Sequence, residues 1–199
     1  LEGAAKCRIT KLGEYIRQRR LDLGLTQEQV CAGICESVTL SRFENGKQTP
    51  SRNRINAILQ RLGLPDDRYY ALVTPEELEI EALKKEIVSC NALKCVEEGF
   101  DKISRLEKIA KPDDQITQQF ILRSKVLLGG LDKRYSNDER IQMLLQAIRM
   151  TIPDFQLDKI EDFLFTLDEM KLVNQIGNAY SLSGDNEKAA DISIDCFNI

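Results

Sequence analysis

Apolar residues recur every three or four positions through most of this chain, which is the spacing of one face of an α-helix. In the first third of the sequence this spacing predicts helices over residues 11–23 and 27–32, a third helix that ends at Asn45-Gly46, and a fourth that ends at Gly63. Their inward-facing side chains are predicted to be Leu12, Ile16, Val30, Leu40, Phe43, Ile55, Ile58, Leu59 and Leu62. No segment of convincing length alternates apolar and polar residues as a strand does, so the sequence predicts an all-α protein.

Residues that favour helix ends separate the predicted helices from one another. Thr26 and Gln29 have the spacing of a capping box at the start of the second helix. Ser37 and Ser51 are expected to cap the third and fourth helices, because a serine hydroxyl accepts hydrogen bonds from the first free backbone N–H groups. Gly33 allows a tight turn between the second and third helices. Two short helices joined by a tight turn predict a helix-turn-helix unit, which can place one helix in the major groove of DNA.

The outward face of the third helix is the candidate reading surface. Burial of Leu40 and Phe43 turns short polar side chains outward, which lets the helix approach base edges closely. A Thr or Val methyl group can contact the thymine methyl group, an arginine can bind guanine or a phosphate, and flanking residues can hold phosphates. The predicted DNA-binding residues are Gln27, Ser37, Val38, Thr39, Ser41, Arg42 and Lys47. The short turn leaves open which of Glu36, Ser37 and Val38 meets a base first.

Charge is unevenly distributed along the chain, although its formal net charge is only −4. Residues 1–65 carry 11 Lys and Arg against 6 Asp and Glu, a net charge of +5, and the rest carries 17 against 26, a net charge of −9. A basic first part joined to an acidic body indicates a polyanionic partner for the first part. Further arginines of that part are expected to be solvated, and they are Arg17, Arg19, Arg52, Arg54 and Arg61.

A change of pattern separates this basic part from the rest. The segment Leu64-Pro65-Asp66-Asp67 interrupts the helical spacing, and Thr74-Pro75 begins a new helix with a cap followed by proline. We therefore expect a helix-turn-helix domain at residues 1–65, a linker at 66–75 and a helical domain at 76–199. Because the chain does not begin with Met and ends inside a helical pattern, we expect it to be a truncated piece of a longer protein.

The last segment, residues 170–197, resembles a tetratricopeptide repeat. The residues at its signature positions are Val173, Ile176, Gly177, Tyr180 and Ala189. Ser193 replaces the usual aromatic residue, so Ile192 and Ile194 are expected to fill that space. A less regular copy of the repeat is expected within residues 117–150.

Stacked repeats of this kind form a concave groove that binds extended peptides or helices. An asparagine amide both donates and accepts hydrogen bonds, so it can pair with the peptide backbone of a ligand. The candidates for contact with a peptide or partner are Asn174, Asn178 and Ser181. The same residues are also expected where an amphipathic helix merely has a solvated polar face.

The six cysteines and the lack of histidine limit the chemistry of the chain. The cysteines lack the paired spacing of zinc sites, and without histidine there is no His-dependent nucleophilic, acid–base or metal chemistry. No phosphate loop, nucleophile elbow or dinucleotide fingerprint occurs, so we expect no catalytic residue, metal or cofactor, and no enzyme. No apolar run approaches the roughly 20 residues that cross a bilayer, and no signal-peptide pattern is found. We therefore expect a cytoplasmic protein with reduced thiols and no membrane contact.

Residues 11–64 resemble the phage-repressor-type (XRE, lambda-repressor-like) helix-turn-helix. The matching residues are Leu12, Arg20, Thr26-Gln27-Glu28, Val30, Leu40-Ser41-Arg42, Glu44, Gly46 and Pro50. The resemblance implies that Arg20 and Glu44 form a partly buried ion pair. The turn Gly33-Ile34-Cys35-Glu36 is one residue shorter than in the phage proteins. This shorter turn agrees better with a subgroup of these regulators from Gram-positive bacteria.

A headpiece of this type followed by tetratricopeptide-like repeats resembles the RNPP group, the peptide-responsive transcription regulators of Gram-positive bacteria, and most of all its Rgg and PlcR branches. The resemblance implies a homodimer that binds an inverted repeat in double-stranded DNA, with a secreted quorum-sensing peptide in the repeat groove. Two alternatives stay open. In one, the repeats serve only dimerisation or protein partners; in the other, the chain is a helical scaffold or adaptor that does not bind DNA. The sequence specifies neither the operator, nor the sign of regulation, nor the peptide.

Overall fold

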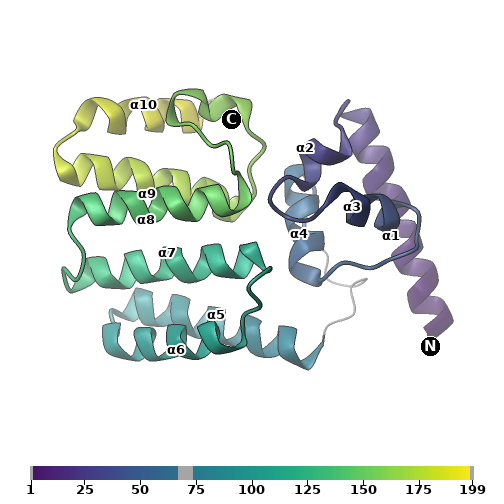
Figure 1. Ribbon diagram of the computed structural model, residues 1–199, viewed down its shortest axis with the longest axis horizontal. Helices are drawn as coiled ribbons and strands as arrows, with labels where there is room; N and C mark the ends of the chain where they lie inside the picture. The colour runs from purple at the N-terminus through teal and green to yellow at the C-terminus, as the bar shows by residue number, and fades with distance from the viewer. Residues whose placement is uncertain (1, 67–73, 198–199) are drawn as a thin grey trace. The chain divides into compact units, whose positions relative to one another are not determined.

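The computed structural model describes residues 2–66 and 74–197 of the chain (Figure 1). Every regular element in this part of the chain is a helix, so the prediction of an all-α protein is confirmed. The helices divide into two compact units: the first contains the residues up to Thr74, and the second begins at Pro75 and continues to the end apart from one short segment. The linker expected at residues 66–75 lies mostly outside the described residues.

The described part of the first unit consists of four helices. They are α1 (Glu2–Asp22), α2 (Gln27–Cys31), α3 (Ser37–Glu44) and α4 (Arg52–Arg61). The first of them begins at Glu2, well before the predicted start at Lys11. The prediction relied on a regular apolar stripe, which residues 2–10 lack, whereas Ala4 and Ala5 favour a helix by intrinsic propensity alone.

Side chains from all four helices form the core of the first unit. Ile16 of α1 packs in the interior with Leu40 and Phe43 of α3, and all three are inaccessible to solvent. Every side chain predicted to face inward is buried except Leu12, which is half-buried. Ile34, in the turn between α2 and α3, is also buried, so the turn itself is anchored in the core.

A close crossing at Gly13 brings α1 against the end of α3. A Cβ atom on Gly13 would lie only 2.2 Å from the carbonyl oxygen of Phe43 and 3.3 Å from the Cα atom of Glu44. These are backbone atoms, so a side chain at this position would force the two helices apart. Sequence spacing does not single out Gly13, because nothing local to α1 records where another helix will cross it.

The second unit is a succession of α-helices in which each helix packs against its neighbours in the chain (Figure 1). The helices are α5 (Pro75–Leu93), α6 (Val96–Ile109), α7 (Gln115–Leu131), α8 (Asn137–Thr151), α9 (Leu167–Ser183) and α10 (Asn186–Phe197). A short 3-10 helix, η1 (Leu157–Asp162), packs against α10 and was not predicted, since its 6 residues are too few to reveal a period. Among the described helices, none has both the length and the apolar character needed to cross a membrane.

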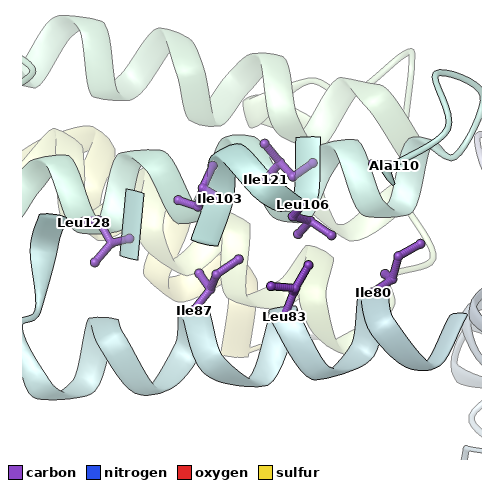
Figure 2. Close-up of a cluster of buried hydrophobic side chains, with 8 residues drawn as sticks. All are labelled: Ile80, Leu83, Ile87, Ile103, Leu106, Ala110, Ile121 and Leu128. Atoms are coloured by element: carbon purple, nitrogen blue, oxygen red, sulfur yellow. The ribbon is translucent and has the colours of Figure 1, made fainter. Parts of the chain in front are cut away.

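Apolar side chains of α5, α6 and α7 form a single cluster (Figure 2). In this view Leu83 and Ile87 of α5 point toward Ile103 and Leu106 of α6. The cluster consists of Ile80, Leu83, Ile87, Ile103, Leu106, Ala110, Ile121 and Leu128. Full burial of one large aliphatic side chain contributes about 1.5–3 kcal/mol relative to exposure. The cluster therefore packs the successive helices α5, α6 and α7 against one another.

Gly177 sets the close approach of α9 and α10. A Cβ atom on Gly177 would lie 3.2 Å from Cγ2 of Ile192, which is buried. The expectation that Ile192 and Ile194 both fill the space beside Ser193 is wrong for Ile194, whose side chain is 58% exposed. Two residues turn a helix by about 200°, so only one of the two isoleucines can face α9.

We predict that Gly13→Ala destabilises the first unit by about 1–3 kcal/mol, the usual cost of overpacking, although alanine by itself favours a helix. The loss arises because backbone atoms of α3 must move to admit the new methyl group. Urea denaturation followed by circular dichroism measures the change. Glu14→Ala, at an exposed position on the same helix, is the matched control and should change stability by less than about 0.5 kcal/mol. Equal stability of the two variants would show that α1 and α3 do not cross closely at Gly13.

Candidate nucleic-acid interface and ligand-binding face

The start of α2 carries the capping box that the sequence predicts. The backbone N–H of Gln29 donates to Thr26 Oγ1 at 3.1 Å, and the backbone N–H of Thr26 donates to Gln29 Oε1 at 2.8 Å. The prediction for α3 is wrong by one residue. Glu36, with an extended backbone, occupies the N-cap position, and Ser37 is the first residue of the helix. The side chain of Glu36 makes no capping hydrogen bond, so the start of α3 is not held by its own cap.

The turn between α2 and α3 is bonded back onto the end of α2. The backbone N–H groups of Ile34 and Cys35 both donate to the Cys31 carbonyl, at 2.9 and 3.0 Å. Gly33 has a φ of +68°, a left-handed conformation that glycine adopts without strain. Together with the buried side chain of Ile34, these features determine the path from α2 into α3.

The predicted reading residues lie on the side of α3 that faces away from the core. Val38 is 52% exposed, although it is apolar, and Arg42 is also exposed. Leu40 and Phe43 occupy the opposite side and are fully buried. Of the predicted set, the exposed residues are Val38, Arg42 and Lys47, and the half-buried ones are Gln27, Ser37, Thr39 and Ser41. Within α3 the structure thus leaves Val38 and Arg42 exposed, and Ser37, Thr39 and Ser41 are only partly accessible.

A buried ion pair connects α1 with the end of α3. Arg20 Nε donates to Glu44 Oε1 at 2.7 Å, and Arg20 Nη2 donates to Glu44 Oε2 at 3.0 Å. Only 9% of the Arg20 side chain and 1% of the Glu44 side chain are exposed. The hydrogen bond with Glu44 raises the pKa of Arg20, and burial opposes this rise. Arg20 Nη1 also donates to the Leu25 carbonyl at 2.9 Å, so one guanidinium holds both α3 and the loop that precedes α2.

Gln27 has a partner that sequence reasoning missed. Its Nε2 donates to Glu44 Oε2 at 2.7 Å. Gln27 is the first residue of α2, so the Glu44 carboxylate accepts hydrogen bonds from both α1 and α2. The two residues are 17 positions apart, and no local pattern in the sequence indicates that they meet.

Two arginines that were expected to be solvated bind backbone carbonyl groups instead. Arg61 is only 5% exposed, and its Nη1 donates to the carbonyl of Ala32 at 2.6 Å and to that of Val30 at 3.3 Å. Carbonyl groups at the end of a helix lack partners within it, so Arg61 of α4 satisfies the end of α2. Arg19 Nε donates to the Leu62 carbonyl at 3.2 Å. The expectation of solvation is therefore wrong for Arg61.

In the second unit, the residues predicted to contact a ligand lie along one side of α9. Asn174, Asn178 and Ser181 are all exposed. On a neighbouring side of α9, Gln175 accepts a hydrogen bond from Nε of Arg123 in α7 at 3.1 Å. Burial lowers the pKa of Arg123, while the nearby carboxylate of Asp168 raises it.

The face formed by Asn174, Asn178 and Ser181 is distinct from the pocket found nearby in the described structure. That pocket, of about 390 Å³, lies between η1 and α10, and none of the three residues lines it. The hydrogen bond between Arg123 and Gln175 links α7 to α9 beside these three residues, so it helps to hold in place the helix that carries them.

Comparison with known proteins bears on both units. A family model described as a helix-turn-helix domain matches residues 11–72. No curated protein matches the chain.

The fold of the whole chain is similar to that of a solved DNA-binding protein. The crystal structure of PlcR from Bacillus thuringiensis, in complex with the peptide PapR7 and DNA, superposes with a TM-score of 0.53 and 22% sequence identity. The similarity covers 95% of this chain and 64% of that chain, so this chain spans less than two thirds of the length of PlcR. At this identity the comparison establishes the shared arrangement of helices.

We predict that Arg20→Ala destabilises the helix-turn-helix domain by about 3 kcal/mol, because it leaves the Glu44 carboxylate buried without its charged partner. Replacing both charges by apolar residues, in Arg20→Met/Glu44→Leu, should recover much of that loss. Equilibrium unfolding in urea measures both changes. Lys171→Ala removes an exposed ion pair with Asp168 and should cost less than about 1 kcal/mol. A cost for Arg20→Ala no larger than for Lys171→Ala would contradict the buried pair.

Proposed function

We propose that this protein is a sequence-specific DNA-binding transcription regulator that works in the cytoplasm, and that its second unit binds a peptide or protein ligand that controls it. The proposal rests mainly on the outward face of α3, because hydrogen bonds to α1 and α2 hold this helix in place. Val38 and Arg42 extend from a helix whose last residue, Glu44, is bonded to α1 and α2. Discrimination between bases needs side chains held in one position by such packing and hydrogen bonds. The helix-turn-helix match over residues 11–72 supports the same function.

The face of α3 offers three kinds of contact to the major groove. Val38 presents two methyl groups that complement the C5 methyl group of thymine. Thr39 presents both a methyl and a hydroxyl group, and the Arg42 guanidinium matches the O6 and N7 acceptors of guanine. Glu36, at the N-cap position, is the acceptor that a cytosine amino group would require. Ser37 and Ser41 are small enough to let the helix backbone approach the bases.

Phosphate contacts on either side of α3 would set its register in the groove. Lys47 is exposed in the loop after α3 and is suited to bind a phosphate. The side-chain amide nitrogen of Gln27 donates to Glu44, so we assign the phosphate contact of Gln27 to its backbone N–H at the start of α2. The net charge of +5 on residues 1–65 favours this contact with a polyanion.

We further propose that the protein binds DNA as a homodimer. One recognition helix covers only a few base pairs, and most such proteins gain affinity by placing two helices in successive major grooves. A two-fold dimer would therefore recognise an inverted repeat whose half-sites are about one helical turn, or a multiple of it, apart.

The ligand proposed for the second unit is a short peptide, in the manner of quorum-sensing regulators built on tetratricopeptide repeats. Asn174 and Asn178 are four residues apart and both exposed, so their amides can pair with successive peptide groups of an extended ligand. The Arg123–Gln175 hydrogen bond would keep this face in place. The similar fold of PlcR, which was solved with the peptide PapR7, supports a peptide ligand.

One alternative has an observation in its favour. Leu78, Val88 and Leu93 of α5 are 59%, 56% and 74% exposed, which would suit a helical unit that serves only dimerisation or protein partners. The two functions differ in whether a short peptide binds to the second unit at all.

To test DNA binding, we would select duplexes from a random library at fixed moderate salt. The parent protein should enrich an inverted repeat, and Thr39→Ala/Arg42→Ala should fail to enrich it, because each lost base contact removes about 1–3 kcal/mol of discrimination. A Glu14→Ala variant controls for surface substitution in the same domain.

The affinity for the selected duplex should fall as salt rises, with a log–log slope of roughly −4 to −8 for a dimer that contacts a few phosphates per domain. A folded protein with no enriched sequence and a flat salt dependence would instead indicate a scaffold without DNA activity.

Peptide binding is tested with a random library of short peptides displayed against the full chain. Asn174→Ala/Asn178→Ala should weaken binding of the enriched peptides by about thirtyfold, since two backbone hydrogen bonds of about 1 kcal/mol each are lost. Glu187→Ala, at an exposed position of α10, is the control and should bind like the parent. Failure to enrich any peptide would favour a second unit that serves dimerisation or protein partners.

A further inference from the structure

Two free cysteines lie on either side of the turn that leads into the reading helix. Cys31 is the last residue of α2 and is 3% exposed, whereas Cys35 lies beyond Gly33 in the turn and is half-buried. The backbone N–H of Cys35 donates to the Cys31 carbonyl at 3.0 Å, as in one turn of α-helix. The path between them is a turn in which Gly33 has a left-handed φ of +68°, and this hydrogen bond closes the turn so that the two residues lie close together.

The two thiols already interact, and their surroundings make them unequal. The hydrogen bond from Cys31 lowers the pKa of Cys35, and the positive charges of Arg54 and Arg61 lower it further, against burial and the charge of Glu36. The same hydrogen bond raises the pKa of Cys31, as does burial. Cys35 is therefore the thiol that ionises first, and the buried Cys31 thiol donates to the Glu28 carbonyl at 3.9 Å. A thiolate with partial exposure beside a second thiol is the arrangement in which oxidation leads to a disulfide.

We propose that Cys31 and Cys35 form a thiol pair that hydrogen peroxide oxidises to an intramolecular disulfide, and that this disulfide weakens DNA binding. The second half of this proposal rests on the proposed DNA-binding function, and the first half does not.

The chemistry proceeds in two balanced steps. The Cys35 thiolate attacks one oxygen of hydrogen peroxide, the O–O bond breaks, and the products are a Cys35 sulfenic acid and hydroxide. The Cys31 sulfur then attacks the Cys35 sulfur, the S–O bond breaks, and the leaving hydroxide takes the Cys31 proton to become water. In total, two thiols lose two hydrogen atoms and one peroxide becomes two waters. Once Cys35 is a sulfenic acid, the negative charge that opposed ionisation of Cys31 is gone.

A disulfide here would move the start of α3. To form the disulfide, the two sulfurs must come within about 2 Å of each other. Cys31 is held in α2 and in the core, so most of the movement falls on Cys35. Cys35 immediately precedes Glu36, and Ser37 begins the reading helix. The start of α3 has no side-chain cap to resist a shift, so the base contacts of its first turn would be displaced.

A second pair of cysteines in the same chain serves as an internal control. Cys90 and Cys95 also lie at a helix end, and the backbone N–H of Cys95 donates to the Cys90 carbonyl at 2.9 Å. The Cys95 thiol donates to the Leu93 carbonyl at 3.8 Å, much as the Cys31 thiol donates to the Glu28 carbonyl at 3.9 Å. Burial raises the pKa of Cys90, and the charge of Glu98 raises it further, which keeps that sulfur a thiol. This pair is five positions apart, one more than Cys31 and Cys35, and its charged neighbours are different.

The chemical half is tested by treating the full chain with hydrogen peroxide, alkylating the remaining thiols and mapping the peptides by mass spectrometry. The expected product links Cys31 to Cys35 while Cys90 and Cys95 are still alkylated. A limiting amount of iodoacetamide should label Cys35 of the untreated chain before Cys95. The proposal is overturned if Cys90 and Cys95 link first, if Cys35 is oxidised without linking to Cys31, or if Cys95 is labelled first.

The regulatory half is tested with the duplex selected by the parent protein. Peroxide should weaken the affinity by about tenfold or more, the size of one lost base contact, and a dithiol reductant should restore it. Cys35→Ser should bind DNA like the reduced parent and lose the response to peroxide, whereas Cys95→Ser should keep the response. A mapped Cys31–Cys35 disulfide with unchanged affinity would overturn regulation alone. If the reduced protein selects no duplex, the DNA-binding function fails while the mapped disulfide still stands.

Discussion

The geometry of the first unit depends on one buried carboxylate. Glu44 ends α3, accepts two hydrogen bonds from Arg20 of α1 and accepts a third from Gln27 at the start of α2. A carboxylate in the interior is stable only when such charged and polar donors surround it, so the three helices must be in their correct positions before it can be buried. The same arrangement that satisfies Glu44 therefore also aligns the two helices of the helix-turn-helix.

Two further contacts hold the helices of the first unit together: a close backbone crossing of α1 and α3, and hydrogen bonds from α4 to the end of α2. Gly13 lets α1 lie directly against the backbone of Phe43, and Arg61 binds the carbonyl groups at the end of α2. These contacts hold α3 from its inner side and from its end. Val38 and Arg42 are consequently exposed, and their chemistry is available to a partner. Cys35 lies in the turn just before α3, and the start of α3 has no side-chain cap.

Much of the fold follows from local patterns in the sequence, and the predictions that failed concern features that such patterns do not record. The capping box of Thr26 and Gln29 and all the inward side chains except Leu12 were predicted correctly, since each depends on residues within a few positions of one another. Arg61 was assigned to solvent because a charged residue on a helix is usually solvated, whereas its partners lie about 30 residues away. The short 3-10 helix was missed for want of a repeating pattern.

The sequence by itself determined the all-α class, the position of the helix-turn-helix and the outward residues of its third helix, because helical periodicity and capping are local properties of the chain. The pairing of Arg20 with Glu44 came from a resemblance and not from the residues themselves. Only the tertiary structure decided that Gln27 donates to Glu44, that α1 crosses α3 at Gly13, and that the charges of two α4 arginines lower the pKa of Cys35. The first two contacts join residues far apart in sequence, and the arginines beside the thiols come from α4, so these details form only when separate helices pack.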